Sequence, residues 1–151
     1  MAKTKDIGAK PFKPAKGKSW GDKVNDPTKT HKVEKLDKDW VDMTKGDRML
    51  IATPKMVDDY LRQIPAGREV SMLTMRKDLA LAHKADNSCP LTTGIFLRIA
   101  AEAALEELNA GKPLKSVAPF WRVVTTKMPV AKKLSCGPEF IEKHRKREKL
   151  S

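Results

Sequence analysis

The stretch CPLTTGIFLRIAAEAALEELNAG, residues 89–111, decides the fold of this chain. Pro90 suits the first position of a helix, and Gly111 is typical of the residue that follows a helix. Apolar residues cover almost the whole circumference between them, and a helix of that kind is buried on most sides. The remaining polar stripe predicts an ion pair between Arg98 and Glu102 on a solvated face. We therefore expect a central helix, with the other elements packed around it.

Two shorter helices are expected before the central one. Thr53 is followed by a proline, which together predict a capped helix start, and apolar residues at helical spacing continue to Ile64. The Pro-Ala-Gly sequence at 65–67 then ends that helix. Thr74 can cap a second helix over 75–85. That helix, a short turn and the central helix predict a helix-turn-helix.

Short strands and a last helix complete the prediction. The runs 48–52 and 121–125 have strand character, and Gly137-Pro138 begins a helix that reaches about Leu150. A helix-turn-helix followed by a strand is typical of winged-helix DNA-binding proteins. The predicted fold class is therefore mainly α: a small winged-helix-like domain of helix-turn-helix and short strands.

Basic residues are concentrated at the two ends of the chain, whereas apolar residues are concentrated in the middle. The 151 residues include 31 Lys and Arg against 19 Asp and Glu, a net charge of +12. Residues 1–45 hold 12 Lys against 7 acids, and residues 127–151 hold 8 basic residues against 3 acids, whereas the middle is richest in apolar residues. We predict a flexible basic arm over 1–45 and one domain over 46–151. In such an arm Trp20 and Trp40 either anchor it to the domain or stack on a nucleic-acid base.

Composition excludes several classes of protein. No apolar run is long enough to cross a membrane, and no secretory signal begins the sequence. Two cysteines, Cys89 and Cys136, do not make a disulfide scaffold and fit the reducing cytoplasm. The scattered cysteines and three histidines have no zinc-site spacing, so we expect no metal and no cofactor. The basic net charge indicates a polyanionic partner, with nucleic acid first.

Three further segments resemble a known family. IPAGREVS at 64–71, PFWRVV at 119–124 and SCG at 135–137 follow the order and spacing seen in the C-terminal domain of the methylated-DNA–protein cysteine methyltransferases and their alkyltransferase-like relatives. The resemblance covers roughly residues 48–150. It implies a DNA-binding helix-turn-helix domain in which Arg122 packs beneath the reactive site.

The same resemblance shows that the chemistry of the family is missing. Phe120 stands where the family has its reactive cysteine, Trp121 where it has the activating histidine, and Glu142 is the candidate for the third, acidic member. Phenylalanine has no nucleophilic atom, so alkyl transfer to position 120 is excluded. The base-flipping tyrosine is also absent, and Gly94 lies at or next to the position of the inserted arginine. Phe120 and Trp121 either form the floor of a pocket in which a flat ring can stack on them, or fill the space that the family's reactive site occupies.

We therefore expect a non-enzymatic DNA-binding protein that senses damaged or misshapen duplex. Thr92, Thr93 and Arg98 of the central helix and Arg122 are the candidate DNA contacts. One alternative is a transferase that uses Cys89, since a helix N-terminus favours the thiolate, although a buried and inert Cys89 is the simpler interpretation. The other alternative is an interaction module that binds RNA or an acidic protein.

Overall fold

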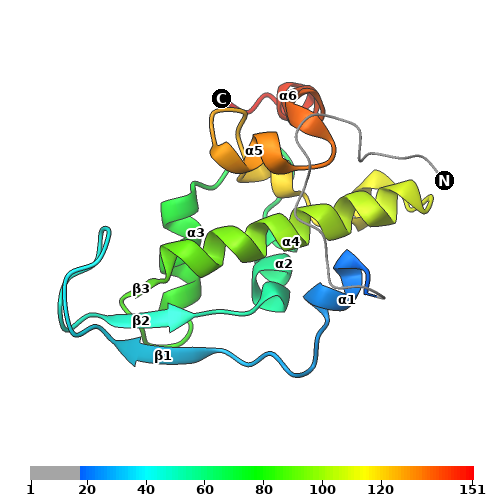
Figure 1. Cartoon of the computed structure of the whole chain (residues 1–151). Coiled ribbons are helices and arrows are strands. Elements are labelled where there is room, and N and C mark those ends of the chain that lie inside the picture. Colours follow the sequence, from blue (N-terminus) through cyan, green and yellow to red (C-terminus); the bar gives the residue numbers. More distant parts are fainter. Residues whose placement is uncertain (1–17) are drawn as a thin grey trace.

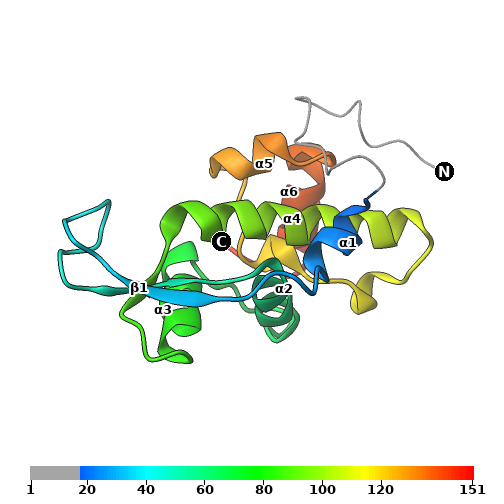
Figure 2. The same cartoon turned by 60° about the horizontal axis from the view of Figure 1, so that its bottom comes forward.

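The computed structural model describes residues 18–151, and these form a mainly helical fold with a small three-stranded sheet. Helix α4 (Pro90–Asn109) runs through the middle of the molecule (Figure 1). Helices α5 (Pro129–Lys133) and α6 (Gly137–Arg147) lie on one side of it, and the sheet lies on the other (Figures 1 and 2). No helix within residues 18–151 has the length and hydropathy of a membrane span.

The remaining elements are short. They are α1 (Trp20–Val24), β1 (Lys32–Lys35), β2 (Arg48–Ile51), α2 (Pro54–Arg62), α3 (Met72–Leu81), β3 (Asn87–Ser88) and the 3-10 turns η1 (Leu114–Ser116) and η2 (Phe120–Arg122). The strands have the order β1-β2-β3, with β1 antiparallel and β3 parallel to β2. Leu50 of β2 pairs with Val33 and Ser88, and it is fully buried in the main hydrophobic core.

The described part of the expected basic arm is folded. Residues 18–45 contribute α1 and β1, and β1 forms the edge of the sheet. Trp20 and Val24 pack against Ile99 and Ala103 of α4, so Trp20 acts as an anchor to the domain. The expectation of a flexible arm was wrong for these residues, because apolar contacts with α4 and strand pairing hold them. Residues 1–17 lie outside the described part of the chain, and the prediction for them stays a prediction.

The second helix begins earlier than the sequence predicts. It starts at Met72 instead of Met75, because the Ser71 hydroxyl, not that of Thr74, caps it by accepting from the Thr74 amide at 3.0 Å. The extra turn places Met72 three residues before Met75, on the face that packs into the core. The helix ends at Leu81.

The strand expected over residues 121–125 is absent, and the chain forms η2 there instead. The side chains of Phe120, Trp121, Val123 and Val124 are all at least 98 % buried. A strand turns successive side chains to opposite faces and cannot bury adjacent pairs against one core. The 3-10 turn after Pro119 does so, and the wing of a winged helix does not form at this place.

The core surrounds the central part of α4. Leu97, Ala100, Ala101 and Ala104 belong to this core, and the small alanine side chains let α2 and η2 approach α4 closely. The helix is buried along most of its length, as its sequence predicts, but its first turns are not. Leu91 and Ile95 are 62 % and 44 % exposed, so the beginning of α4 offers an apolar surface to solvent.

Candidate functional site

An ion pair joins η2 to the C-terminal end of α6. Arg122 donates from Nε and Nη2 to the two carboxylate oxygens of Glu148, each at 2.8 Å, and from Nη1 to the Ile64 carbonyl at 2.7 Å. Glu148 also accepts from the Gly67 amide at 3.0 Å and from the Trp121 indole N–H at 2.9 Å. The site therefore connects the Ile-Pro-Ala-Gly turn, η2 and α6.

Each oxygen of Glu148 accepts two hydrogen bonds, and this stabilises the ionised carboxylate. Burial alone raises the pKa of Glu148, but the hydrogen bonds from Arg122, Gly67 and Trp121 outweigh it and hold this pKa at about 2. Glu148 and Arg122 are thus a structural pair. Three of the five N–H groups of Arg122, the residue expected to contact DNA, are used in these bonds, and its side chain is 14 % exposed.

A cluster of aromatic rings lies behind this ion pair. Phe120 has no exposed surface and stacks on Phe140, with ring centroids 5.7 Å apart, and Trp121 meets both rings edge-on. His144 packs against Trp121 and Phe140. Burial, and then the nearby Arg147 and Lys143, lower the pKa of His144, which favours the neutral ring. Phe120 therefore fills space in the core, and only Trp121 lines a pocket.

Glu142 does not belong to this site, and the prediction that placed it with Phe120 and Trp121 was wrong. Its side chain is exposed on the outer face of α6 and borders a different hollow, near Thr125 and Ser151. Glu148 is the carboxylate that contacts Trp121. The position of Glu148 could have been predicted from the sequence. Its helical spacing from Ile141, His144 and Arg145 places all four residues on one buried face of α6.

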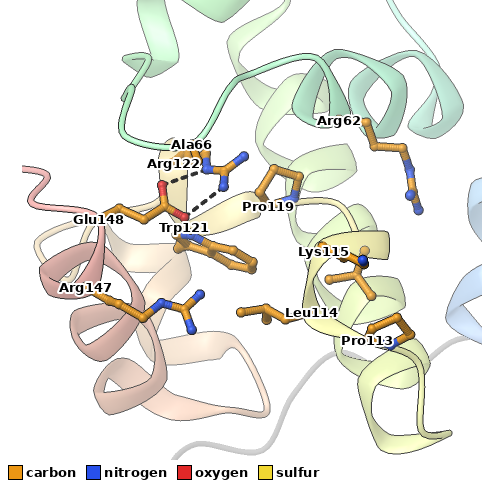
Figure 3. A pocket seen from close by; sticks show the side chains of 11 residues that line it. Arg62, Ala66, Pro113, Leu114, Lys115, Pro119, Trp121, Arg122, Arg147 and Glu148 are labelled. Carbon is orange, nitrogen blue, oxygen red and sulfur yellow. Dashed lines mark hydrogen bonds and ion pairs between the residues drawn. The ribbon is translucent and has the colours of Figure 1, made fainter.

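An open pocket of about 630 Å³ lies beside Trp121. Its walls come from the end of α2, from η1 and η2, and from the end of α6 (Figure 3). Arg147 and Leu114 face one another across it, with the indole of Trp121 between them and the Arg122–Glu148 pair along one side (Figure 3). The pocket thus combines apolar walls with basic side chains.

The beginning of α4 differs from the expected DNA contact surface. Thr93 is completely buried and Thr92 is half-buried, with both hydroxyl oxygens inside the protein. Cys89 caps the helix: its buried Sγ accepts from the Thr92 amide at 3.4 Å. Thr93 therefore cannot touch a nucleic acid in this conformation, and Cys89 presents no thiol to solvent.

Arg98 is the predicted residue that reaches a basic surface. Its side chain is half-buried and donates from Nη2 to the Lys133 carbonyl at 3.3 Å. Lys132 and Lys133, at the end of α5, are exposed. Together with the exposed Leu91 and Ile95 these three basic residues form a surface that we call the α4–α5 face.

The two glutamates of the polar stripe of α4, Glu102 and Glu106, do not form a solvated face. Each accepts hydrogen bonds from another segment of the chain. Glu102 is 3 % exposed and accepts from the Ser135 amide and hydroxyl, at 3.0 and 2.6 Å. Burial raises the pKa of Glu102 despite these bonds. Glu106 accepts from the amides of Trp20 and Gly21, at 2.9 and 3.0 Å, and so caps α1. These two glutamates fasten the segment before α6 and the segment around α1 to the central helix.

The surroundings of the second cysteine disfavour its thiolate form. Cys136 is buried, and burial together with the nearby Glu102 raises the pKa of its thiol to about 12. Its Sγ donates to the Gly137 carbonyl at 3.2 Å. Within residues 18–151 no three His, Cys, Asp or Glu side chains are grouped as a metal site would require.

Comparison with known proteins gives no relative: no family model, no curated protein and no solved structure matches the chain.

Proposed function

We propose that this protein binds duplex DNA through the α4–α5 face, on a scaffold like that of the alkyltransferase-like proteins, without transferring an alkyl group. The sequence resemblance to that family and the net charge of +12 support the class of ligand. In this proposal α3 and α4 are the helix-turn-helix, and the first half of α4 lies against the duplex. Shape or damage, and not base sequence, is what such a surface recognises.

The observation that carries the proposal is the composition of the α4–α5 face. Arg98, Lys132 and Lys133 gather beside the exposed start of α4, and the Arg98–Lys133 hydrogen bond fixes their proximity. Cations in this arrangement neutralise phosphates. Leu91 and Ile95 are exposed on the same part of α4, and exposed apolar side chains are used as wedges by proteins that bind bent or damaged DNA.

Several features argue against alkyl transfer. Phe120 carries no nucleophile and is fully buried. Cys89 and Cys136 are unpaired and buried, so neither thiol meets a substrate on the surface. The two free cysteines also fit the proposed cytoplasmic location, where thiols stay reduced. An enzyme based on Cys89 is therefore less well supported than a binding protein.

A protein partner is the second candidate, and the β1–β2 connection favours it. Trp40 and Val41 are exposed at the tip of this connection, which projects from the sheet (Figure 1). Residues 36–47 contain four aspartates against two lysines. Arg76 of α3 pairs with Asp42, which leaves three aspartates against the two lysines. The acidic and apolar tip suits a basic protein surface better than DNA.

Paired charge variants test whether the α4–α5 face is responsible for binding duplex DNA. We expect Lys132→Gln/Lys133→Gln to weaken binding of a fluorescent duplex and to reduce the slope of log affinity against log salt by about two units, one for each phosphate that the variant no longer neutralises. Lys29→Gln/Lys112→Gln removes the same charge from exposed positions outside the α4–α5 face. If both double variants lose affinity equally, attraction to the overall charge explains binding and the α4–α5 face does not.

A further inference from the structure

The second half of α6 and the residues that follow it carry basic side chains toward solvent. Lys143, Lys146, Arg147 and Lys149 are exposed, and none of them forms an ion pair with another residue of the described part of the chain. The helix lies on the side of α4 away from the sheet (Figures 1 and 2). We call these four basic residues the α6 patch.

Two carboxylates beside the α6 patch already have basic partners. Glu148 is paired with Arg122 and Glu69 with Arg145, and the side chains of these two arginines are only 14 % and 7 % exposed. Each pair carries no net charge, so neither glutamate balances the charge of a lysine in the patch. The positive charge of the patch is therefore left to face solvent.

Two further glutamates, Glu139 and Glu142, are exposed in the first half of α6. Glu139 belongs to the first turn, where the helix dipole favours an acid. Within residues 18–151 neither glutamate forms an ion pair with the patch. The buried His144 senses the surplus of positive charge: burial, and then Arg147 and Lys143, lower the pKa of its imidazole.

Lys149 is held in an unfavourable backbone conformation. Its φ is +60°, in the left-handed region that favours glycine. Helix α6 ends here, because the Lys149 amide donates to the Lys146 carbonyl at 3.0 Å and the Leu150 amide to the Arg145 carbonyl at 2.9 Å. Glycine is the usual residue at such a helix end, and a lysine there costs stability. Residues kept in conformations of this kind are concentrated at functional sites, so Lys149 indicates a function for the patch.

The composition of the α6 patch decides which polyanion it fits. None of the large hydrophobic side chains that are exposed within residues 18–151 belongs to α6. A helix that lies on a membrane needs an apolar face, and proteins that bind single-stranded nucleic acid use exposed aromatic rings for stacking. A surface of cations alone fits the phosphates of a duplex, whose bases are already stacked.

We propose that the α6 patch is a second DNA-binding surface, which contacts phosphates of a duplex through Lys143, Lys146, Arg147 and Lys149 without reading bases. The choice of duplex DNA as the ligand rests on the proposed function. The patch shares no residue with the α4–α5 face, so each surface can be altered without changing the other.

The salt dependence of binding tests the patch. A fluorescent duplex is titrated with the full chain at several salt concentrations. We expect Lys146→Gln/Lys149→Gln to weaken binding and to reduce the slope of log affinity against log salt by about two units. Lys29→Gln/Lys45→Gln removes the same charge from exposed positions before β1 and in the β1–β2 connection, and it should keep the parental slope. Equal slopes for the two double variants would overturn the proposal.

The same titration separates this proposal from that of the α4–α5 face. If Lys132→Gln/Lys133→Gln reduces the slope and Lys146→Gln/Lys149→Gln does not, the α6 patch is refuted and the proposed function stands. The reverse result supports the α6 patch and refutes the α4–α5 face. Phosphatidylserine vesicles and a single strand of equal length are the competing polyanions. A larger effect of Lys146→Gln/Lys149→Gln on either of them than on the duplex would also overturn the proposal.

Lys149→Gly tests the patch without a cost in folding. Glycine relieves the left-handed conformation, which offsets the lost interaction of the lysine charge with the helix dipole. We therefore expect an unchanged or higher thermal midpoint, together with a slope reduced by about one unit. An unchanged slope would exclude Lys149 from the DNA contact and contradict the proposal.

Discussion

At the scale of single residues, the carboxylate of Glu148 is the most consequential group. Its pKa is about 2 in the folded protein, well below the ordinary value of 4.5, so folding favours its ionised form. The stability that it contributes is complete above pH 4.5 and is lost as the pH falls toward 2. A difference of this size corresponds to roughly 3 kcal/mol at neutral pH.

We therefore predict that Glu148→Gln lowers the free energy of unfolding by roughly 3 kcal/mol at pH 7 and by much less at pH 3, as measured by urea denaturation. Glu142→Gln, on the exposed face of the same helix, should stay within about 0.5 kcal/mol of the parent. The opposite ranking of the two variants would restore Glu142 as the partner of Trp121.

The cysteines provide a second test at this scale. Cys89 and Cys136 are buried, and the pKa of the Cys136 thiol is raised to about 12. We predict that neither reacts with a disulfide-exchange reagent in the native protein and that both react once urea has unfolded it. Rapid modification of Cys89 under native conditions would reopen the enzyme hypothesis.

At the scale of elements, two glutamates of α4 hold two different segments. Glu102 binds the Ser135 amide and hydroxyl before α6, and Glu106 binds the amides of Trp20 and Gly21 at the start of α1. Since the two glutamates bind different segments, we expect each segment to unfold locally without the other.

We predict that Glu102→Ala speeds hydrogen exchange at the Ser135 amide and costs about 2 kcal/mol, because it leaves buried donors without an acceptor. Glu106→Ala should instead speed exchange at Trp20 and Gly21. Faster exchange at both places in either variant would mean that the two segments unfold as one unit.

A helix or strand could be predicted where residues next to it in the sequence determine it. It could not be predicted where distant parts of the chain determine it. The start of α4 at Pro90 and the capping of α2 by Thr53 follow from neighbouring residues, and both are confirmed. The strand β1 carries outward-facing lysines and owes its conformation to pairing with β2, which lies more than ten residues further along the chain. At 121–125 the need to bury adjacent side chains overrode strand propensity, and no local signal shows that need.

At the scale of the whole molecule, three surfaces of different character lie apart. The α4–α5 face is basic and partly apolar, the tip of the β1–β2 connection is acidic, and the pocket beside Trp121 is a third region. Of the site residues expected from sequence, Arg98 reaches the α4–α5 face and Trp121 reaches the pocket. Thr93 and Phe120 are buried, and Arg122 is bound to Glu148. Helical periodicity shows which residues share a face, but whether that face is buried depends on the elements that pack against it. The sequence does not show those elements, and so the exposure of these residues was predicted wrongly.

The most direct test of DNA binding is a residue-resolved NMR titration of the protein with a short duplex at low salt. The proposal predicts that the amides of Leu91, Ile95, Arg98, Lys132 and Lys133 shift together, while the Trp121 indole and the amides of Trp40 and Val41 do not. Shifts confined to the basic residues outside the α4–α5 face, or no shifts within residues 18–151, would contradict it.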